Sequence, residues 1–445
     1  MTFDLIIKNG TLICMDEPRR VLEAHHLGIL NGKIEAIFPA GSSSYEAKEE
    51  LDADNCLVLP GLINAHSHLA MTYFRGLADD LPLDKWLQGF IWPLEARLIK
   101  PQFVYDATLH GASEMIRHGI STSNDMYFCM SSIADACSDA GLRVIISEAL
   151  IDHQSNEEAG TELIGSKIAE LSAEYRHNPL ISFSLAPHSI YTCSSQTLQR
   201  CAEVATRHDW LLHMHLCETA SEVENCHNAH GKNPVAYLRD LGLLEAKALF
   251  AHGIWLDDEE LSLLQGRQNV SIAICTKSNL KLSSGFAPLK KYRDRGIKTC
   301  LGTDGVASNN NLDLLSELSL TSKLHKALNN EPTFLPAEEA LAMITIDAAK
   351  ALGKAQEIGS LEPGKLADIA IMSLAGIESQ PCYNPYSHLL YAASSSAIRD
   401  MIIQGKVVMR ARKLTQVDES RIVATAKQYQ GRIIKELKQD EIAEK

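Results

Sequence analysis

The sequence predicts an α/β protein in which a (β/α)8 barrel of the TIM type carries a discontinuous small β-sandwich domain built from both chain ends. Three observations predict this fold class. Short apolar runs alternate with amphipathic helical stretches through the middle of the chain. Both ends instead show the alternation and turn residues of β-hairpins. Polar side chains follow several apolar runs, at the strand ends where parallel barrels keep their active sites.

The middle of the chain carries the barrel pattern. Alternation of strands and helices over about 300 residues favours a parallel sheet, and a barrel of strand–helix units fits that length. The predicted strands of this part include Val144–Ile146, Ile181–Leu185, Leu211–His215, Ala248–Ala251, Val270–Ile274 and Lys298–Leu301.

The two chain ends are predicted to be β structure. Asn9-Gly10 and Asn31-Gly32 each separate two apolar runs, which predicts a hairpin turn at both places. The C-terminal end shows the same pattern, with Gly405 as a turn. Its predicted strands are Ala367–Met372, Ile398–Ile403 and Val407–Met409. We expect the two ends to pair with each other into one small domain.

These patterns divide the chain into three stretches. Residues 1–57 are predicted to form the first part of the β-sandwich, and residues 58–362 the barrel. Residues 363–445 are predicted to form the second part of the β-sandwich and a C-terminal helix. The helix is expected on the surface from Glu419 to Lys445, because this tail is charged and helix-prone.

The composition excludes several classes of function. The 42 Lys and Arg residues against 56 Asp and Glu residues give a net charge of −14, which argues against a nucleic-acid or anionic-membrane partner. The 11 cysteines form no C-x-x-C pair and indicate reduced thiols. The sequence shows no signal-peptide pattern, and no apolar run approaches the roughly 20 residues of a membrane span. We therefore expect a cytoplasmic protein.

The string Asn64-Ala-His66-Ser-His68 is the first chemical motif. It follows a predicted buried strand, Cys56–Pro60, which Gly61 closes. Two histidines at positions i and i+2 of a strand point to the same face, and neutral imidazole is a common metal ligand. The pair is therefore a candidate for half of a metal site, although a lone His-x-His string is a weak motif.

Further polar residues follow the later predicted strands. In a parallel barrel the carboxyl ends of the strands meet at one face, so we expect these side chains to gather there. In chain order they are His188, His213, His215, Glu218, His252 and Asp304.

The residue types suit one hydrolytic metal ion. Three imidazoles and one carboxylate can hold Zn²⁺ and leave a position for a water molecule, whose pKa falls to about 7. Glu218 lies three positions after His215, close enough to carry protons between the water and a leaving group. His252 is available to orient or polarise the attacking water.

Several of these residues have a structural alternative. His213 is predicted to be a packed strand residue, because only one of His213 and His215 need bind the metal and Glu218 favours His215. Asp304 also fits a turn before a glycine. Glu95, taken on the sequence pattern alone, fits a solvated helix residue.

Longer strings around these residues resemble the amidohydrolase superfamily, and within it the cytosine-deaminase-like branch. The strings are Pro60–His68, His215–Thr219, Ala251–Gly253 and Gly302–Asn310. Others resemble 5-methylthioadenosine/S-adenosylhomocysteine deaminases more closely, namely Met71–Gly76, Ser278–Pro288 and Ala307–Asn310. The resemblance covers nearly the whole chain. It implies a zinc-dependent enzyme that hydrolyses adenosine derivatives to the inosine analogue and ammonia.

The resemblance also implies a role for each matching residue in the metal site. One Zn²⁺ per subunit, with Fe²⁺ or Mn²⁺ as alternatives, would be held by His66, His68, His215 and Asp304. Glu218 would give a proton to the purine ring nitrogen next to the reacting carbon. A proton from the water would pass to His252 and Asp304.

The resemblance implies substrate contacts as well. Glu95 would accept hydrogen bonds from the ribose hydroxyls, and His188 would contact the nucleoside. Some relatives carry an arginine in the segment that matches Ile146–Leu150, where this chain has Glu148. An acidic group there predicts a poor fit for a carboxylate-bearing substrate. Methylthioadenosine, S-adenosylhomocysteine, adenosine and 5′-deoxyadenosine all stay open as substrates.

Two other functions fit the same strings. One is a triazine chlorohydrolase, or another heterocycle deaminase, on the same scaffold. The other is a non-catalytic relative that keeps the fold for assembly. For the deaminase we expect a small-molecule nucleoside substrate and no membrane or nucleic-acid partner, and the resemblance leads us to expect a homo-oligomer.

Overall fold

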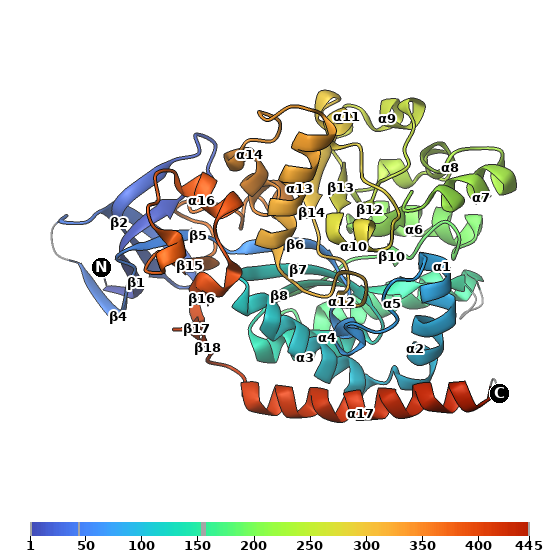
Figure 1. Ribbon diagram of the computed structural model, residues 1–445, viewed down its shortest axis with the longest axis horizontal. Helices are drawn as coiled ribbons and strands as arrows, with labels where there is room; N and C mark the ends of the chain where they lie inside the picture. The colour runs from blue at the N-terminus through green and yellow to red at the C-terminus, as the bar shows by residue number, and fades with distance from the viewer. Residues whose placement is uncertain (1, 43–44, 153–156, 444–445) are drawn as a thin grey trace.

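The computed structural model describes residues 2–42, 45–152 and 157–443, and Figure 1 shows how they are arranged. A barrel of parallel strands and its surrounding helices form the larger part. A sheet built from both chain ends lies against one side of the barrel, on the left of Figure 1. Helix α17 (Glu419–Ala443) runs along the lower edge in that view. The predicted fold class and the predicted C-terminal helix are confirmed.

Short parallel strands form the barrel. β9 and β10 both pair with β8 and together occupy one strand position of the barrel. A parallel β-bridge between Leu185 and Leu212 connects this position to β11. On the opposite side, Asp304 N donates to His66 O at 3.0 Å and joins the end of β14 to β6. The strands are β6 (Leu62–Ser67), β7 (Ile120–Tyr127), β8 (Arg143–Leu150), β9 (Ile181–Phe183), β10 (Ala186–Pro187), β11 (Leu212–Leu216), β12 (Ala248–His252), β13 (Val270–Ile274) and β14 (Lys298–Leu301).

The predicted buried strand Cys56–Pro60 is strand β5, which pairs with strands of the terminal sheet and lies outside the barrel. The histidine motif instead ends β6, and His68 lies just beyond that strand, at the start of the 3-10 helix η1 (Leu69–Phe74). Strand β7 was missed because its sequence, ISTSNDMY, is mostly polar, although all of its residues are buried.

The strands of the two chain ends form one nine-stranded sheet in the order β18-β17-β16-β15-β5-β1-β2-β3, with β4 paired to β1. β5 joins the two ends, because it pairs with β1 on one side and with β15 on the other. The predicted pairing of the ends is confirmed, whereas the limits of the three stretches stay predictions. The strands are β1 (Thr2–Ile13), β2 (Val21–Leu30), β3 (Lys33–Pro39), β4 (Glu46–Asp52), β5 (Cys56–Pro60), β15 (Ile369–Ser373), β16 (Ile398–Ile403), β17 (Lys406–Arg410) and β18 (Lys413–Leu414).

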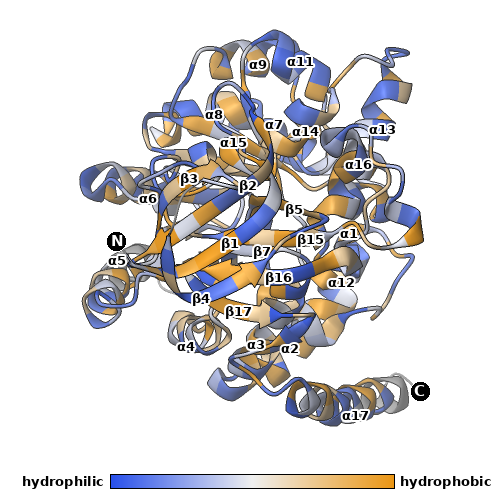
Figure 2. Cartoon of the chain, turned by 90° about the vertical axis from the view of Figure 1, so that its left-hand side faces the viewer, coloured by the Kyte–Doolittle hydropathy of each residue, from blue (hydrophilic) through white to orange (hydrophobic). Residues whose placement is uncertain are grey.

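This sheet has an apolar core of its own, to which both chain ends contribute. Figure 2 looks onto the sheet and shows hydrophobic residues along β1, β15 and their neighbours. The buried side chains of this core include Ile7, Leu27, Val58, Ile371 and Ile402. The ends therefore need each other to bury their apolar surface.

Of the two predicted turns near the N-terminus, one is a hairpin and the other is a bulge. Asn31 and Gly32, with φ of 51° and 77°, connect the antiparallel strands β2 and β3, as predicted. Asn9-Gly10 instead lies inside the continuous strand β1, where the register with β2 shifts. A Cβ atom on Gly10 would lie 2.5 Å from Val58 Cγ2, so the glycine allows β5 to pack closely against β1.

A buried ion pair connects the barrel to the terminal sheet. Arg143 Nε at the start of β8 donates to Asp368 Oδ2 at 2.9 Å, and Arg143 Nη2 donates to Asp368 Oδ1 at 3.1 Å. The backbone N of Gln404 donates to the same Oδ1 at 2.7 Å. Because the two charged side chains are only 3% and 2% exposed, each loses its hydration and needs the opposite charge of the other to compensate that loss.

Helices cover the outside of the barrel (Figure 1). Among the described residues, none of them combines the length and the apolar character that a membrane-spanning helix needs. The remaining helices are α1 (Leu83–Trp86), the π-helix η2 (Leu87–Ile91), α2 (Trp92–Leu98), α3 (Pro101–Arg117), α4 (Met130–Ala140), α5 (Glu157–Glu174), α6 (Ser195–His208), α7 (Ala220–His230), α8 (Pro234–Asp240), η4 (Leu243–Glu245), α9 (Asp258–Leu264), α10 (Thr276–Lys281), α11 (Leu289–Asp294), α12 (Val306–Asn309), α13 (Leu314–Leu328), α14 (Ala337–Ala342), α15 (Ile346–Ala351), η5 (Ile377–Ser379), α16 (Pro385–Tyr391) and η6 (Ser395–Ala397).

Candidate metal centre and active site

Four histidines and one aspartate meet at the carboxyl end of the barrel. His66 lies in β6 and His68 just after it, His215 lies in β11, His252 ends β12, and Asp304 follows β14. His66 and His252 are almost fully buried, and the side chain of His68 is 11% exposed. Side chains far apart in the sequence are thus brought to one point by the parallel strands.

The distances define one compact cluster. One ligand atom from each of His66, His215, His252 and Asp304 lies within 4.8 Å of the others. His68 belongs to the same cluster, because its Nε2 lies 3.2 Å from Asp304 Oδ1 and 3.3 Å from His215 Nε2. His66 Nε2 lies 3.4 Å from Asp304 Oδ1. Five potential ligands therefore surround one position.

The hydrogen bonds of two histidines leave the Nε2 atoms free for a cation. His68 Nδ1 lies 2.6 Å from the carbonyl oxygen of Met126, and His215 Nδ1 lies 2.9 Å from that of His188. A carbonyl only accepts, so each Nδ1 carries a proton, and each Nε2 presents a lone pair whenever the ring is neutral. The two Nε2 atoms lie 3.3 Å apart, close enough for one positive ion to bind both.

The electrostatics of the cluster also favour a positive ion. Burial works against the ionised carboxylate of Asp304, but the neighbouring imidazoles of His66 and His68 outweigh it and hold the pKa of Asp304 well below its usual range. Burial alone would lower the pKa of His68, but the neighbouring Asp304 carboxylate raises it to about 9, so a positive charge is favoured at this Nε2, carried either by a proton or by a metal ion. Burial lowers the pKa of His66 to about 4, so this ring is a neutral ligand at neutral pH. The buried Nε2 of His66 has no hydrogen-bond partner among the described residues. The donor set therefore fits a divalent metal ion.

Asp304 is held in place by its own neighbours. Its Oδ2 accepts hydrogen bonds from Ser278 Oγ at 2.6 Å and from Ser308 Oγ at 2.8 Å, which leaves Oδ1 toward the histidines. The backbone of Asp304 is left-handed, with φ of 61°. A Cβ atom on Gly302 would lie 2.7 Å from His66 Cβ, so the glycine lets β14 approach β6. Asp304 is thus both the turn residue before Gly305 and a member of the cluster.

His213 contacts His66 on the side of the ring that faces away from the cluster. Its Nε2 lies 2.7 Å from His66 Nδ1, and its Nδ1 lies 3.1 Å from Asn124 Nδ2. The side chain is fully buried, as expected of a packed strand residue. Because His213 contacts the outer nitrogen of His66, it fixes the orientation of that ring, as the partners of metal-binding histidines commonly do.

Glu218 and His252 form a second pair beside the cluster. His252 Nε2 lies 3.7 Å from Glu218 Oε2, while His252 Nδ1 donates to Asn279 Oδ1 at 2.8 Å. Burial raises the pKa of Glu218 above its usual value. Glu222 accepts from the backbone N of Cys217 and of Glu218, at 3.0 and 2.9 Å, and so holds the loop that carries Glu218. A buried carboxyl in this position is suited to proton transfer.

Glu95 and His188 face the same space from other elements. Glu95 on α2 is buried, and Tyr127 OH donates to its Oε1 at 2.5 Å. Burial raises the pKa of Glu95 to about 7. The alternative of a solvated helix residue is therefore wrong for Glu95. His188 follows β10, and burial lowers its pKa to about 3, so its ring is neutral.

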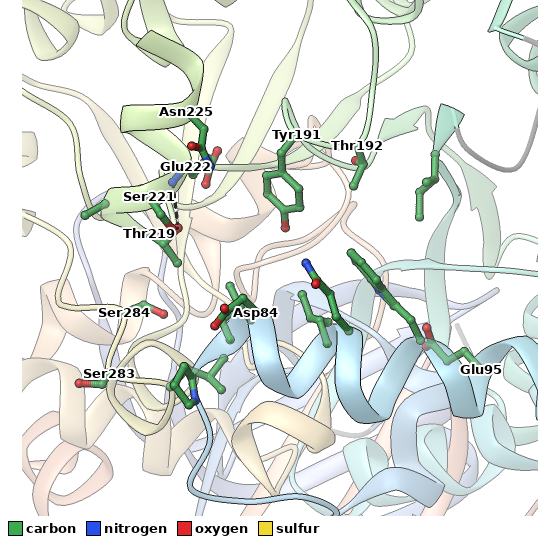
Figure 3. Close-up of a pocket in the computed structure, with 18 of the residues that line it drawn as sticks. Asp84, Glu95, Tyr191, Thr192, Thr219, Ser221, Glu222, Asn225, Ser283 and Ser284 are labelled. Carbon is green, nitrogen blue, oxygen red and sulfur yellow. Dashed lines mark hydrogen bonds between the residues drawn. The ribbon is translucent and has the colours of Figure 1, made fainter. Parts of the chain in front are cut away.

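Two connected cavities lead to the cluster. The inner cavity, of about 70 Å³, is lined by the metal-binding candidates His68, His215 and Asp304, together with Glu218 and His188. The outer cavity, of about 1160 Å³, opens between α1–η2–α2 and the loops after β10 and β11. Figure 3 shows this outer cavity, with Asp84 and Glu95 on the helical side and Tyr191 and Thr219 opposite. Glu95 and Tyr191 line both cavities.

The expected influence of Glu148 on the substrate needs correction. Glu148 is not among the residues that line either cavity, whereas its neighbour Ala149 lines the inner one. Its carboxylate instead pairs with Lys167 Nζ on α5 at 2.6 Å. Because alternate residues of a strand face opposite sides, Glu148 points outward and does not act on a bound substrate.

The residues that support the site were not evident from the sequence patterns. They are Asn124, Tyr127, Glu222, Ser278, Asn279 and Ser308. Two features of the sequence could have indicated some of these residues. Asn124 and Tyr127 belong to the polar run ISTSNDMY, and Ser278-Asn279 opens one of the strings that carry the family resemblance.

A parallel barrel with a histidine–aspartate cluster at the carboxyl ends of its strands defines the class of metal-dependent hydrolases. Comparison with protein families agrees: the model described as "Amidohydrolase family" matches residues 57–408. The chain belongs to the amidohydrolase family.

Individual relatives show which members of this family the chain resembles. The chain is 40% identical over 430 residues to a protein of Thermodesulfovibrio yellowstonii named 5-methylthioadenosine/S-adenosylhomocysteine deaminase, covering 97% of this chain and 95% of that one. It is also 40% identical over 381 residues to a 5′-deoxyadenosine deaminase of Methanothermobacter thermautotrophicus, covering 86% and 88%. A crystal structure of an adenosine deaminase from Xanthomonas campestris with bound zinc superimposes with a TM-score of 0.93, at 36% identity, over 98% of this chain and 99% of that one.

Proposed function

We propose that this protein is a zinc-dependent hydrolytic deaminase of adenosine derivatives. The observation that carries the proposal is the cluster of His66, His68, His215 and Asp304, with Glu218 and His252 directly beside it. The relatives named as deaminases of methylthioadenosine and of 5′-deoxyadenosine, and the zinc-bound adenosine deaminase structure, support the choice of substrate class and metal.

The proposed ligands are His66, His68, His215 and Asp304, with Fe²⁺ or Mn²⁺ as alternatives to Zn²⁺. The free Nε2 atoms and the Oδ1 of Asp304 support this choice. When bound, such an ion lowers the pKa of a coordinated water to about 7 and so supplies a nucleophile at neutral pH. His252 stays free in this assignment, because its Nε2 also approaches Glu218.

The remaining residues of the site move protons. We assign the acceptance of a proton from the attacking water to His252 and Asp304. Glu218 is assigned the delivery of a proton to the purine ring nitrogen next to the reacting carbon. Its burial supports this role, because a carboxyl with a raised pKa holds a proton closer to neutral pH. Asn279 keeps the Nε2 of His252 free by accepting the proton of Nδ1.

The overall reaction balances with one water molecule. The water oxygen forms a bond to C6 of the adenine ring, and the bond from C6 to the amino nitrogen breaks. One proton of the water leaves with the amino group as ammonia, the other ends on the purine ring nitrogen next to C6, and the product is the corresponding inosine analogue. Glu95 accepts hydrogen bonds from the ribose hydroxyls in this proposal, and His188 contacts the nucleoside.

The test is turnover by the zinc-loaded protein. We expect the pure protein to release ammonia from methylthioadenosine with the matching change in purine absorbance. Absence of turnover with methylthioadenosine, 5′-deoxyadenosine and adenosine would overturn the proposal. Release of chloride from a chlorotriazine in the same assay would establish the alternative function.

Substitution of Glu218 tests the proton-transfer role. Glu218→Gln is expected to keep the bound zinc but to lower kcat by about 10²- to 10⁴-fold, because a positioned proton donor contributes that much. Glu224→Gln, an exposed residue on the following helix α7, is the matched control and should keep the wild-type kcat. Metal content is measured in both variants. A Glu218→Gln protein with normal kcat would show that another group transfers the proton.

The oligomeric state and the location of the protein in the cell stay predictions. The family resemblance leads us to expect a homo-oligomer, and the composition leads us to expect the cytoplasm. Size-exclusion chromatography with light scattering would decide the first point.

A further inference from the structure

We propose that the outer cavity binds the 5′ substituent of the nucleoside and that Asp84 makes it select neutral or positively charged substituents over negatively charged ones. The proposal rests on the deaminase function given above. It deepens that function by naming the class of substrate that the site prefers.

The sizes of the two cavities place the substrate across both. The inner cavity holds about 70 Å³, whereas sites for small organic ligands commonly measure roughly 300–1,000 Å³. A nucleoside that reaches the metal cluster therefore extends into the outer cavity of about 1160 Å³. The two cavities share part of their walls, including Leu83, Leu87, Trp92, Glu95, Phe128 and Tyr191. If Glu95 holds the ribose at this junction, the 5′ substituent lies in the outer cavity.

The described lining of the outer cavity contains carboxylates but no cation. The acidic residues are Asp84, Glu95 and Glu222, and neither lysine nor arginine is present among the lining residues. The stretch 153–163, whose side chains are not described, contains no lysine or arginine in its sequence either. Lys281, next to the wall residue Leu282, already donates to Asp79 and Asn310. An anionic substituent therefore finds no partner of opposite charge.

Asp84 is the carboxylate that is available to a ligand. Glu95 accepts a hydrogen bond from Tyr127, and Glu222 accepts two from the backbone. The side chain of Asp84 has no hydrogen bond or ion pair with the residues that the structure describes, and it projects into the cavity in Figure 3. An ammonium group in the cavity would gain an ion pair with it, whereas a carboxylate would be repelled.

Aromatic side chains complete the environment for an uncharged or cationic group. Trp92, Tyr191 and Trp255 line the outer cavity, and Trp255 Nε1 donates to Ser284 O at 2.8 Å, which fixes that ring. Aromatic faces attract cations and bury alkyl groups such as a methylthio group. Homocysteine as a 5′ substituent carries both charges, and only its ammonium group would be compensated here.

The test compares three substrates of matched length: an alkylthio-, an aminoalkylthio- and a carboxyalkylthio-deoxyadenosine. For the zinc-loaded wild type, we expect kcat/KM for the amine and the neutral compound to exceed that for the carboxylate. Asp84→Asn should lower the ratio of kcat/KM for the amine to that for the carboxylate about tenfold, because one partly exposed ion pair and one repulsion are removed. Asp84→Lys should make the carboxylate the better of the two charged substrates.

The matched control is Asp80→Asn, which removes the same charge from an exposed residue outside the cavity lining. We expect it to leave the ratio near the wild-type value. An unchanged ratio in Asp84→Asn, or an equal change in Asp80→Asn, would overturn the proposal while methylthioadenosine is still deaminated. Failure of the wild type to deaminate even methylthioadenosine would overturn the proposed function itself, so the two failures are distinguishable.

Discussion

Single polar groups in this site are held so that one atom stays free for a ligand. His68 and His215 each give the Nδ1 proton to a backbone carbonyl and keep Nε2 for the cluster. Asp304 uses Oδ2 for two serines, and its Oδ1, which also accepts from the backbone N of Gly305 at 2.8 Å, faces the histidines. Glu95 receives the hydroxyl of Tyr127 at Oε1 and keeps Oε2 for another donor. Such partners orient each group before the ligand arrives, which lowers the cost of binding.

Glu95 gives a prediction about pH at the level of one residue. Burial raises its pKa from 4.5 to about 7, so the carboxyl is protonated below pH 7 and ionised above it. The ionised form accepts hydrogen bonds from the two ribose hydroxyls more strongly. We therefore expect KM for methylthioadenosine to fall as the pH rises through about 7. The measurement is KM as a function of pH.

Two controls accompany this measurement. Glu95→Gln cannot ionise, so its KM should be higher and should lack this pH dependence. A substrate without the ribose hydroxyls should show the same flat profile with the wild type. A pH profile shared by wild type and Glu95→Gln would contradict the assigned role.

At the level of elements, hydrogen bonding decides where a strand lies as much as hydrophobicity does. Strand β7 is polar in sequence, but its side chains bind the neighbouring strand and loop. Asp125 Oδ1 accepts from Leu69 N at 2.7 Å and from Ser67 Oγ at 3.0 Å, and Asn124 Nδ2 donates to Ala65 O at 3.0 Å. These bonds compensate part of the cost of burying the polar groups, although Asn124 Oδ1 and Asp125 Oδ2 have no hydrogen-bond partner among the described residues. A pattern of apolar runs cannot reveal such a strand.

The placement of β5 and β1 shows the same limit. β5 is as apolar as a barrel strand, but its pairing with β1 and β15 puts it in the terminal sheet. Asn9-Gly10 has the composition of a hairpin turn, but the packing of Val58 against Gly10 keeps β1 continuous. In both cases the local sequence fits two structures, and the neighbouring strand selects one.

The ion pair between β8 and the terminal sheet gives a prediction at this level. Arg143→Met leaves Asp368 buried without its cation, and we expect the free energy of unfolding to fall by about 3–5 kcal/mol. Denaturant unfolding of the metal-loaded protein measures this loss.

The double variant Arg143→Met with Asp368→Leu is the control for that prediction. It removes both charges, so it should be more stable than Arg143→Met alone. If the double variant loses as much stability as the sum of the single losses, the two residues are not coupled and the ion pair does not connect barrel and sheet energetically.

At the level of the whole molecule, the metal cluster ties together strands from opposite parts of the chain. His66 and Asp304 are joined by a backbone hydrogen bond across the closure of the barrel, while His215 comes from the facing side. The Nε2 atoms of His68 and His215 lie 3.3 Å apart, and that of His68 lies 3.2 Å from Asp304 Oδ1, so one bound cation would hold these strand ends together. Such an ion would therefore stabilise the closed barrel.

Removal of the metal gives a prediction for the whole molecule. An ion that binds only the folded state adds about 4 kcal/mol when its free concentration is about 1,000-fold above Kd. We expect a chelator to lower Tm and added zinc to restore it. His66→Ala should show a much smaller shift with chelator, because it lacks one proposed ligand. A Tm of the wild type that does not respond to a chelator removing all of its zinc would contradict this role.

Much of the candidate site was predictable from the sequence, because its residues occur in distinctive strings. His66-Ser-His68 and the string from His215 to Glu218 lie at strand ends whose apolar runs are evident, and the structure brings them together with Asp304. The supporting residues were not predictable in this way, because Asn124 and Tyr127 reach their partners only through side-chain contacts between strands. The prediction for Glu148 was wrong for a similar reason. The sequence does not reveal which face of β8 its side chain takes, and the structure turns it toward Lys167, away from the cavities.

Composition and spacing along the chain were enough to predict the alternation of strands and helices, the turn at Asn31-Gly32, and the residue types of a metal site, because these features are local. Contacts in three dimensions were needed to show that β5 belongs to the terminal sheet, that Glu95 is buried against Tyr127, and that Asp84 lines the outer cavity without a partner among the described side chains. The reason is physical. Burial, pairing and the charge that surrounds a group arise from segments far away in the chain, and no local pattern contains them.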